Sequence, residues 1–245
     1  MSVRITLATA IRVLTQLRRD PRTVALLLAV PPVLLTLLKY VFQQQPRAFQ
    51  TVGAPLVGLF PFTTMFLVTS ITMLRERSTG TLERLMTMPL AKLDLLLGYG
   101  LAFAAVGSIQ ALITAGVGFA LLGLGVAGST PLVIALAVGN AVLGMALGLF
   151  TSAFARTEFQ AIQFFPAVVL PQLLLCGLFV PRARMAPLLQ GVSDALPLTY
   201  AFDGLQRAAV RGALGARGEL DIAVIAGATL LAMSLGAATL RRRSR

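Results

Sequence analysis

Residues 131–154 read PLVIALAVGNAVLGMALGLFTSAF, an uncharged and mostly apolar run. A membrane-spanning helix needs about 20 apolar residues to cross about 30 Å of hydrocarbon, so this run is long enough to be one. Five comparable runs lie at roughly 24–42, 52–74, 93–122, 164–180 and 221–240. The sequence therefore predicts an all-α, polytopic membrane protein with six transmembrane helices.

The composition of the whole chain supports this prediction. Of its 245 residues, 57% are hydrophobic and 12% are charged, whereas a soluble domain has about 45–50% apolar and about 25% charged residues. So little charge argues against an ordinary soluble enzyme. The chain has one cysteine, Cys176, and no histidine. An intrachain disulfide, a cysteine zinc cluster and a histidine-dependent triad are therefore excluded.

Length and proline content make three of the runs unusual. The run 93–122 is long for one span, so it either tilts or continues beyond the membrane. Pro166 and Pro171 predict a kinked or broken fifth helix, and Pro31 and Pro32 lie in the middle of the first. The arginines before the first run resemble the start of a signal peptide. However, the run is too long and no small-residue cleavage site follows it, so we interpret it as a retained span.

The net charge of +12 follows the expected topology. With the N-terminus in the cytoplasm, fourteen of the 21 Lys and Arg residues fall on cytoplasmic segments and seven on outer ones. Cytoplasmic loops collect Lys and Arg, so this distribution favours both termini inside. Five of the seven outer arginines lie in the segment 181–220, where a longer loop carries less weight in the rule. The basic excess thus indicates topology rather than nucleic-acid binding.

Residues 1–20 form a separate amphipathic segment. Its apolar residues recur at three- and four-residue spacing: Val3, Leu7, Ala10, Ile11, Leu14 and Leu17. A second face carries Arg4, Arg12, Thr15 and Arg19. This pattern predicts a helix that lies in the membrane interface and ends before Pro21. A soluble helix packed against a partner is the alternative.

The sequence contains no motif that would supply energy or catalysis. Lys39 and Lys92 are the only lysines, and neither is followed by Ser or Thr, so a P-loop for ATP is excluded. The nine carboxylates lie in loops, at span ends or in the N-terminal segment, which leaves no obvious carrier for proton or sodium coupling. A formal G-x-G-x-x-G at 123–128 follows a helix-length run and predicts a turn. If the protein moves a molecule uphill, the energy would have to come from another chain.

Few polar residues lie inside the spans. They are Ser108, Gln110 and Thr114 in the third, Asn140 in the fourth and Gln172 in the fifth. Such residues either hydrogen-bond between helices or line a pathway, and helix packing is the commoner use. Gly144 and Gly148 form a GxxxG pair, for which packing within one subunit is favoured over a dimer seam.

The segment between the second and third spans is the most informative. Residues 75–90 read RERSTGTLERLMTMPL. Thr81 can cap a short helix whose first turn holds Glu83, where a negative charge favours the helix dipole. Glu76, Gly80 and Glu83 would share a face if one helix ran through all three. A short charged helix between two spans is typical of a docking element, and a solvated loop is the alternative.

Two blocks of sequence resemble ABC-2-type permeases, the membrane subunits of type-2 ABC exporters such as the daunorubicin-exporter-like group. The first block is residues 75–90. The second comprises GLFVPR at 177–182, MAP at 185–187 and LPLTYAFDGL at 196–205, and is similar to the family's segment between the fifth and sixth spans. The resemblance covers nearly the whole chain, as length, spans and both blocks follow the family's order. The Pro31-Pro32 pair departs from the family pattern.

The resemblance implies a role for each segment. Residues 1–20 would be the interfacial elbow helix. The coupling helix, which docks on a separate ATP-binding subunit, would include Glu76, Gly80, Thr81, Glu83 and Arg84. Within the extracellular segment 181–220, the stretch 181–211 would form short extracellular helices, partly re-entrant, and the segment would be marked by Pro181, Pro197, Tyr200 and Asp203. An i,i+4 pair between Asp203 and Arg207 would account for part of the outer charge.

The resemblance implies a single transmembrane domain over residues 1–245, in a bacterial plasma membrane. It would be the permease subunit of an ATP-driven exporter of amphipathic or lipophilic cargo, such as a drug, an antibiotic or a lipid-like molecule. Its partners would be the bilayer, a second identical or similar permease and an ATPase subunit that binds ATP and Mg²⁺. The chain itself would bind no cofactor, metal or nucleic acid and catalyse nothing alone.

Three alternatives remain at this point. An ion-coupled secondary transporter is disfavoured by the absence of mid-span carboxylates. A membrane-embedded enzyme is disfavoured by the missing histidine and the lack of a nucleophile cluster. A non-transporting membrane scaffold or immunity protein would show the same spans.

Overall fold

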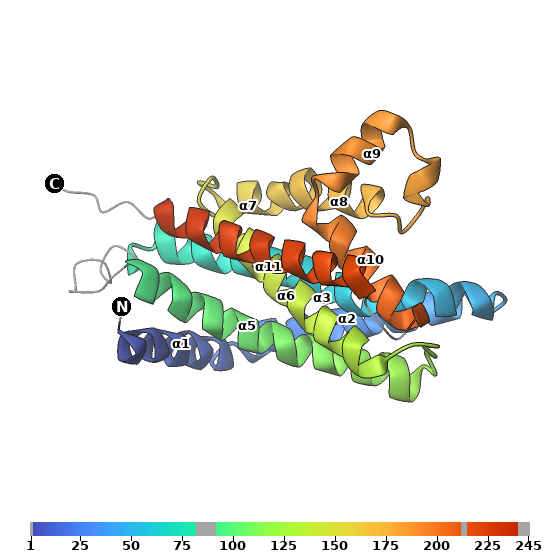
Figure 1. Ribbon diagram of the computed structural model, residues 1–245. Helices are drawn as coiled ribbons and strands as arrows, with labels where there is room; N and C mark the ends of the chain where they lie inside the picture. Colours follow the sequence, from blue (N-terminus) through green and yellow to red (C-terminus); the bar gives the residue numbers. More distant parts are fainter. Residues whose placement is uncertain (1, 82–91, 212–214, 240–245) are drawn as a thin grey trace.

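The computed structural model of the protein describes residues 2–81, 92–211 and 215–239, and in these ranges it is almost entirely helical, with no strand. Within these described residues, six helical segments are long and apolar enough to cross a membrane: 21–41, 46–78, 93–121, 130–151, 158–175 and 215–238. The predicted all-α class and six spans are confirmed. Figure 1 shows these spans side by side in one bundle, with the start of α1 and the end of α11 at the same end of it.

Three helices form the centre of the bundle: α3 (Pro46–Ser78), α5 (Lys92–Gly116) and α6 (Thr130–Thr151). More than half of each of these spans is buried within the subunit. By contrast, α2 (Pro21–Val41) and α11 (Gly215–Ala238) bury less than a third. The outer helices thus leave apolar surface for lipid or for other subunits.

Glycines on α6 allow α3 and α6 to approach closely. A Cβ atom at Gly144 would collide with the carbonyl oxygen of Phe62, and one at Gly148 would collide with that of Phe66. Both carbonyls belong to the backbone of α3, which cannot rotate away as a side chain can. The GxxxG pair therefore packs inside one subunit, the alternative that the sequence favoured.

Helix α2 runs without interruption although Pro31 and Pro32 lie inside it. A proline has no N–H, so the carbonyl four residues before it loses its helical donor. For Pro31 this carbonyl belongs to Leu27, and it accepts a hydrogen bond from Nε2 of Gln110 on α5. Gln110 thus satisfies the carbonyl that Pro31 leaves free and holds α2 against α5.

We expect Gln110→Leu to destabilise the protein by about 1–3 kcal/mol, because the buried Leu27 carbonyl then has no donor. Adding Pro31→Ala should recover most of this loss, since alanine restores the missing backbone N–H. The four members of this double-mutant cycle can be compared by thermal unfolding of the purified protein. The same loss in both the Pro31 and the Pro31→Ala backgrounds would contradict this explanation.

The fifth span differs from its predicted range of 164–180. It consists of α7 (Glu158–Phe164), a π-helical turn (Phe165–Val169) and α8 (Leu170–Leu175). It begins earlier because the Thr157 hydroxyl caps α7, accepting a hydrogen bond from the Gln160 N–H at 3.2 Å. It ends earlier because Gly177 adopts a φ of 104°, which a helix cannot contain. The interruption predicted from the prolines is present as the π-helical turn, which contains Pro166.

At the end of the bundle away from the start of α1, the connections between the spans are short or helical. The third span continues from α5 into a π-helical turn (Val117–Leu121), and the glycine-rich stretch after it is a turn with Gly123 at a φ of 65°. Between the fifth and sixth spans lie a 3₁₀ turn (Arg182–Arg184), α9 (Pro187–Asp194) and α10 (Pro197–Arg211). Helix α10 packs against α3, α6 and α11, so this outer segment is part of the folded core.

Helix α1 (Val3–Arg18) packs on α5 near the start of both helices (Figure 1). Its buried residues are Thr6, Thr9, Ala10 and Val13. Gly98 of α5 permits the close contact, because a Cβ atom there would lie 2.5 Å from the Cβ of Thr9. The apolar residues Val3, Leu7, Ile11 and Leu14 are exposed instead. The amphipathic helix is thus present, and its position in the membrane interface stays a prediction.

Candidate functional site

Side chains of three helices meet where the segment 75–81 leaves the bundle. Arg12 of α1 donates a hydrogen bond from Nη2 to the Tyr99 hydroxyl of α5, and its guanidinium carbon lies 5.5 Å from the centre of the Tyr99 ring. The same nitrogen lies 3.8 Å from Oε2 of Glu76, in the last turns of α3. We call these three residues the Arg12 cluster.

The Arg12 cluster holds the end of α3, where residues 75–90 begin; we call these residues the coupling segment after the role that the sequence predicts for them. Glu76 is 8% exposed and Tyr99 is fully buried. A buried carboxylate is stable only beside a cation or hydrogen-bond donors, and Arg12 supplies that charge. A second link lies nearby, where the backbone N–H of Ser2 donates to Oδ2 of Asp94 at 3.0 Å. Helix α1 is therefore tied to both helices that flank the coupling segment.

Helix α3 ends at Ser78, before the rest of the coupling segment. Gly80 follows with a φ of 73°, a conformation that interrupts a helix and favours glycine. The helix that holds Glu76 therefore does not continue through Gly80, so the condition under which Glu76, Gly80 and Glu83 would share a face is not met. Thr81 lies beside the helix end, with its hydroxyl 3.0 Å from that of Thr79. Glu83 and Arg84 lie outside the described residues.

An exposed ion pair joins the end of α3 to the start of the fifth span. Arg75 donates from Nε to Oε1 of Glu158 at 2.7 Å and from Nη2 to Oε2 at 3.0 Å. Both side chains are more than half exposed, so water screens the pair and it adds little stability. Its two parallel hydrogen bonds fix the orientation of α7 relative to the end of α3.

The three polar residues for which the sequence left helix packing or a pathway open, Gln110, Asn140 and Gln172, all lie inside the subunit. Gln110 bonds to α2, as described above. Gln172 is nearly buried in α8 and donates to the Val168 carbonyl of its own helix at 3.0 Å. Asn140 is fully buried, and a Cβ at Gly58 of α3 would lie 3.0 Å from its Nδ2. None of the three faces an open surface of the subunit, which fits helix packing better than a pathway.

Two other amides on the fifth span are exposed. Gln160 and Gln163 of α7 line a cavity of about 470 Å³, together with Phe154, Arg156, Phe164 and Ala167. We call this lining the α7 face. Neither glutamine was predicted as a site residue, because the expected start of the span was residue 164. The signal that could have found them is Thr157-Glu-Phe-Gln160, a capping-box pattern that marks the start of a helix.

The α7 face belongs to the span that packs least on its own subunit, with 17% of its apolar window buried. Amides are costly against lipid, so an outward-facing pair indicates contact with water or with another protein surface. Phe154 and Phe164 add aromatic surface beside the Arg156 charge. This combination suits an amphipathic molecule with an apolar ring system and a polar or negative group.

At the opposite end, a chain of alternating charges joins the outer segment to the sixth span. Arg182 lies 2.9 Å from Asp194 and 2.5 Å from Asp203. Arg207 lies 3.6 Å from Asp203, the predicted i,i+4 pair, and also binds Asp221 of α11. Burial raises the pKa of the Asp203 carboxyl above its ordinary value, and the two arginines oppose this shift.

The other outer residues singled out in the sequence support this charge chain. The Tyr200 hydroxyl donates to the backbone carbonyl of Asp194 at 2.7 Å. Pro197 is the first residue of α10, and Pro181 precedes the 3₁₀ turn that begins at Arg182. Both prolines stand where a helix begins and its first N–H groups need no partner. These residues therefore hold the outer segment in shape.

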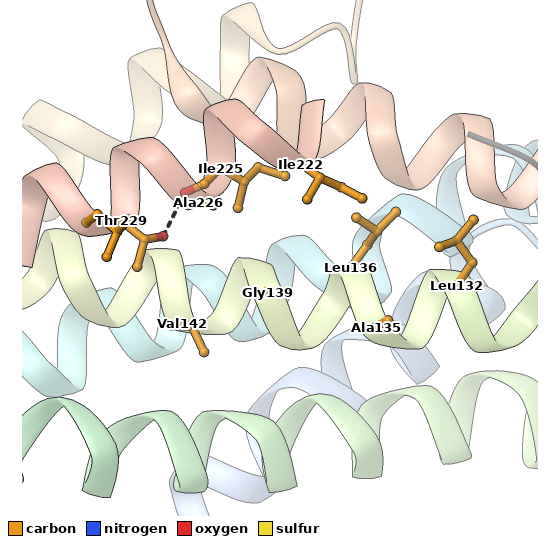
Figure 2. Close-up of a pocket in the computed structure, with 10 residues that line it drawn as sticks. Leu132, Ala135, Leu136, Gly139, Val142, Ile222, Ile225, Ala226 and Thr229 are labelled. Atoms are coloured by element: carbon orange, nitrogen blue, oxygen red, sulfur yellow. Dashed lines mark hydrogen bonds between the residues drawn. The ribbon is translucent and has the colours of Figure 1, made fainter. Parts of the chain in front are cut away.

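A groove of about 530 Å³ lies between α6 and α11, as Figure 2 shows. Its lining is apolar apart from Thr229, whose hydroxyl donates to the Ile225 carbonyl of its own helix at 2.8 Å. The groove therefore offers volume without a polar group that would orient a ligand. Over the described ranges, no group of three Cys, Asp or Glu residues could hold a metal ion.

Comparison with known proteins identifies the family. Residues 6–209 match the model of the ABC-2 type transporter family. "ABC transporter G family member 20" of Dictyostelium discoideum is 26% identical over 157 residues, which are 64% of this chain and 22% of that protein. Two proteins of Escherichia coli K12 are also similar. "Probable multidrug ABC transporter permease YbhR" is 27% identical over 148 residues, and "Inner membrane transport permease YhhJ" is 28% identical over 151.

The E. coli alignments cover 60% of this chain in each case and 40% and 39% of those two proteins, so the chain spans less than half the length of the curated relatives it matches. The family model, in contrast, extends from α1 to the end of α10 and includes the Arg12 cluster, the α7 face and most of the outer charge chain. The chain is therefore a multi-pass membrane protein that belongs to the ABC-2 type transporter permease family.

Proposed function

We propose that the protein is the permease subunit of an ATP-driven exporter, paired with a separate ATP-binding subunit and a second permease. The proposal rests on the side-chain contacts that hold the end of α3, where the coupling segment begins. Arg12 and Arg75 tie the end of α3 to α1, α5 and α7. A push on the residues after Gly80 would therefore move several spans together rather than bend one loop.

The energy would come from the partner. ATP and Mg²⁺ would bind to the ATP-binding subunit, and closure of that subunit would displace the coupling segment. In support, the described carboxylate nearest the middle of a span is Asp221, and it still lies within two turns of the start of α11. That position suits hydrogen bonding and ion pairs better than an ion relay across the membrane.

The α7 face would line the transport pathway and adjoin the second permease, identical or similar. Its support is the outward position of Gln160 and Gln163 on the least buried span. An amphipathic or lipophilic cargo, such as a drug, an antibiotic or a lipid-like molecule, fits the aromatic and polar lining. The names of two relatives, which include "multidrug" and "transport permease", point in the same direction.

The proposed location is a bacterial plasma membrane with both termini in the cytoplasm. The start of α1 and the end of α11 lie at one end of the bundle (Figure 1). The same end carries the exposed arginines of α1 and the Arg75 pair. Since cytoplasmic segments collect basic residues, this end would face the cytoplasm, where an ATP-binding subunit could reach the coupling segment.

Glu83→Ala tests the docking role directly. We expect it to lower cargo-stimulated ATP hydrolysis by the complex about tenfold, a loss of about 1.4 kcal/mol of coupling energy, while membrane insertion stays intact. The matched control is Glu219→Ala, which removes an exposed carboxylate from the opposite end of the bundle and should leave hydrolysis unchanged. Full coupling in the Glu83→Ala complex would remove the role assigned to this residue.

A further inference from the structure

We propose that the outward face of α1 binds the headgroups of anionic phospholipids in the membrane leaflet at that end of the bundle. The inference does not depend on what the protein transports. It rests on the two faces of α1 and on the charges beside its exposed apolar residues.

The inward contacts fix which side of α1 faces out. The buried Thr9 packs on Gly98 of α5, and Arg12 reaches Tyr99 and Glu76 at the edge of that contact. Ser2 bonds to Asp94 at the beginning of the helix. With three such contacts along its length, α1 cannot rotate to bury another face without breaking them.

The outward face carries an apolar stripe. Val3 is 74% exposed, Leu7 50%, Ile11 63% and Leu14 37%, and a spacing of three and four residues places them in one row. Figure 1 shows α1 at the edge of the bundle, beside α5. A row of exposed branched side chains on a helix tied to membrane spans is typical of a helix whose apolar side enters the headgroup boundary.

Arginines accompany this stripe. Arg4 lies next to Val3, and Arg18 and Arg19 follow Leu14 by about one turn; all three are exposed. Helix α1 contains no carboxylate. Among the described residues, the ion pairs that involve α1 use Arg12 alone. Asp20 follows Arg19 as the one nearby carboxylate in the sequence, so the exposed face combines apolar side chains with a net positive charge.

The positive charge beside the apolar stripe indicates which molecule binds this face. A zwitterionic headgroup would satisfy the apolar stripe but give the arginines no net attraction. An anionic phospholipid satisfies both, and each arginine near such a surface strengthens binding roughly fivefold. An acidic protein surface would match the charges, but the exposed stripe would then be covered by protein instead of lipid. The two occupants can be distinguished experimentally.

The absence of tryptophan from the chain provides a clean probe. Leu7→Trp places a single fluorophore in the stripe of the full-length protein, reconstituted in phosphatidylcholine bilayers with a minor fraction of phosphatidylglycerol. Bromine on the acyl chains quenches tryptophan on contact. Two samples of identical lipid composition carry bromine either on the phosphatidylglycerol or on an equal amount of the phosphatidylcholine.

We expect emission typical of an apolar environment and at least roughly fivefold stronger quenching by the brominated phosphatidylglycerol. Replacing Arg4, Arg18 and Arg19 together by Gln should abolish this preference while the emission stays blue-shifted. The matched control replaces three exposed arginines at the opposite end, Arg184, Arg211 and Arg217, by Gln and should preserve the preference.

Equal quenching by both brominated lipids would overturn the proposal, as would a preference that survives in the triple α1 variant. Unquenched emission would show that protein or water covers the stripe, and would also overturn it. The measurement needs no nucleotide, cargo or ATP-binding subunit. A negative result would therefore leave the proposed transport function unaffected.

Discussion

Gly144→Ala should destabilise the protein strongly, whereas Gly139→Ala on the same helix should not. The added Cβ at Gly144 would collide with the Phe62 carbonyl of α3, while no atom lies within 4 Å of a Cβ at Gly139. Overpacking of this kind costs about 1–3 kcal/mol or more when the obstacle is backbone. At Gly139 the alanine gains helix propensity instead, about 0.5–1 kcal/mol.

Both variants make the same chemical change in α6 and therefore gain the same helix propensity. A difference in stability between them reports the steric cost of the added Cβ. Thermal unfolding of the two purified proteins, and of Gly148→Ala as a second close contact, gives the measurement. Gly144→Ala and Gly148→Ala should unfold several degrees below Gly139→Ala. Equal unfolding temperatures for all three would mean that the α3–α6 contact is looser than described, or that the GxxxG pair faces another subunit.

Asp221→Ala should destabilise the protein by about 3–5 kcal/mol, the cost of leaving a partly buried charge without its partner. The Asp221 side chain is 3% exposed and that of Arg207 is 20% exposed. Arg207 would keep Asp203 at 3.6 Å, but Asp203 already pairs with Arg182. The variant would then lose the buried ion pair that joins α10 to α11, although the packing between the two helices would remain.

A double variant tests whether the stability lost in Asp221→Ala comes from the Arg207 charge that is left without Asp221. Asp221→Leu with Arg207→Met removes both charges, and we expect it to recover most of the stability lost in Asp221→Ala. The control is Glu158→Gln, which breaks the exposed pair with Arg75 and should cost less than about 1 kcal/mol. If the double variant is as unstable as Asp221→Ala, the two side chains stabilise the protein through contacts other than their own ion pair.

The sequence predicts those features that depend on neighbours along the chain. The six spans follow from runs of apolar residues, which a single helix needs in order to cross lipid. The Asp203–Arg207 pair follows from helical spacing. The turn at Gly123 follows from glycine after a helix-length run. Each of these can be inferred without knowing which helix packs against which.

Features that depend on distant contacts were not predictable. Nothing local links Gln110 to the Leu27 carbonyl, which Pro31 leaves without a donor. Helix periodicity groups the apolar residues of α1, but it cannot say that Thr6 and Thr9 face the bundle. The start of the fifth span was misplaced for a different reason. Gln160 and Gln163 lower the apolar signal at a position where the helix has already begun.

We propose above all that this permease draws its energy from a separate ATP-binding subunit. The direct test reconstitutes the purified chain in vesicles, with and without that subunit, and follows accumulation of an amphipathic fluorescent dye. We predict accumulation that needs both the subunit and hydrolysable ATP and is lost in the Glu83→Ala complex. Dye accumulation by the chain alone, driven by a proton gradient without ATP, would contradict the account.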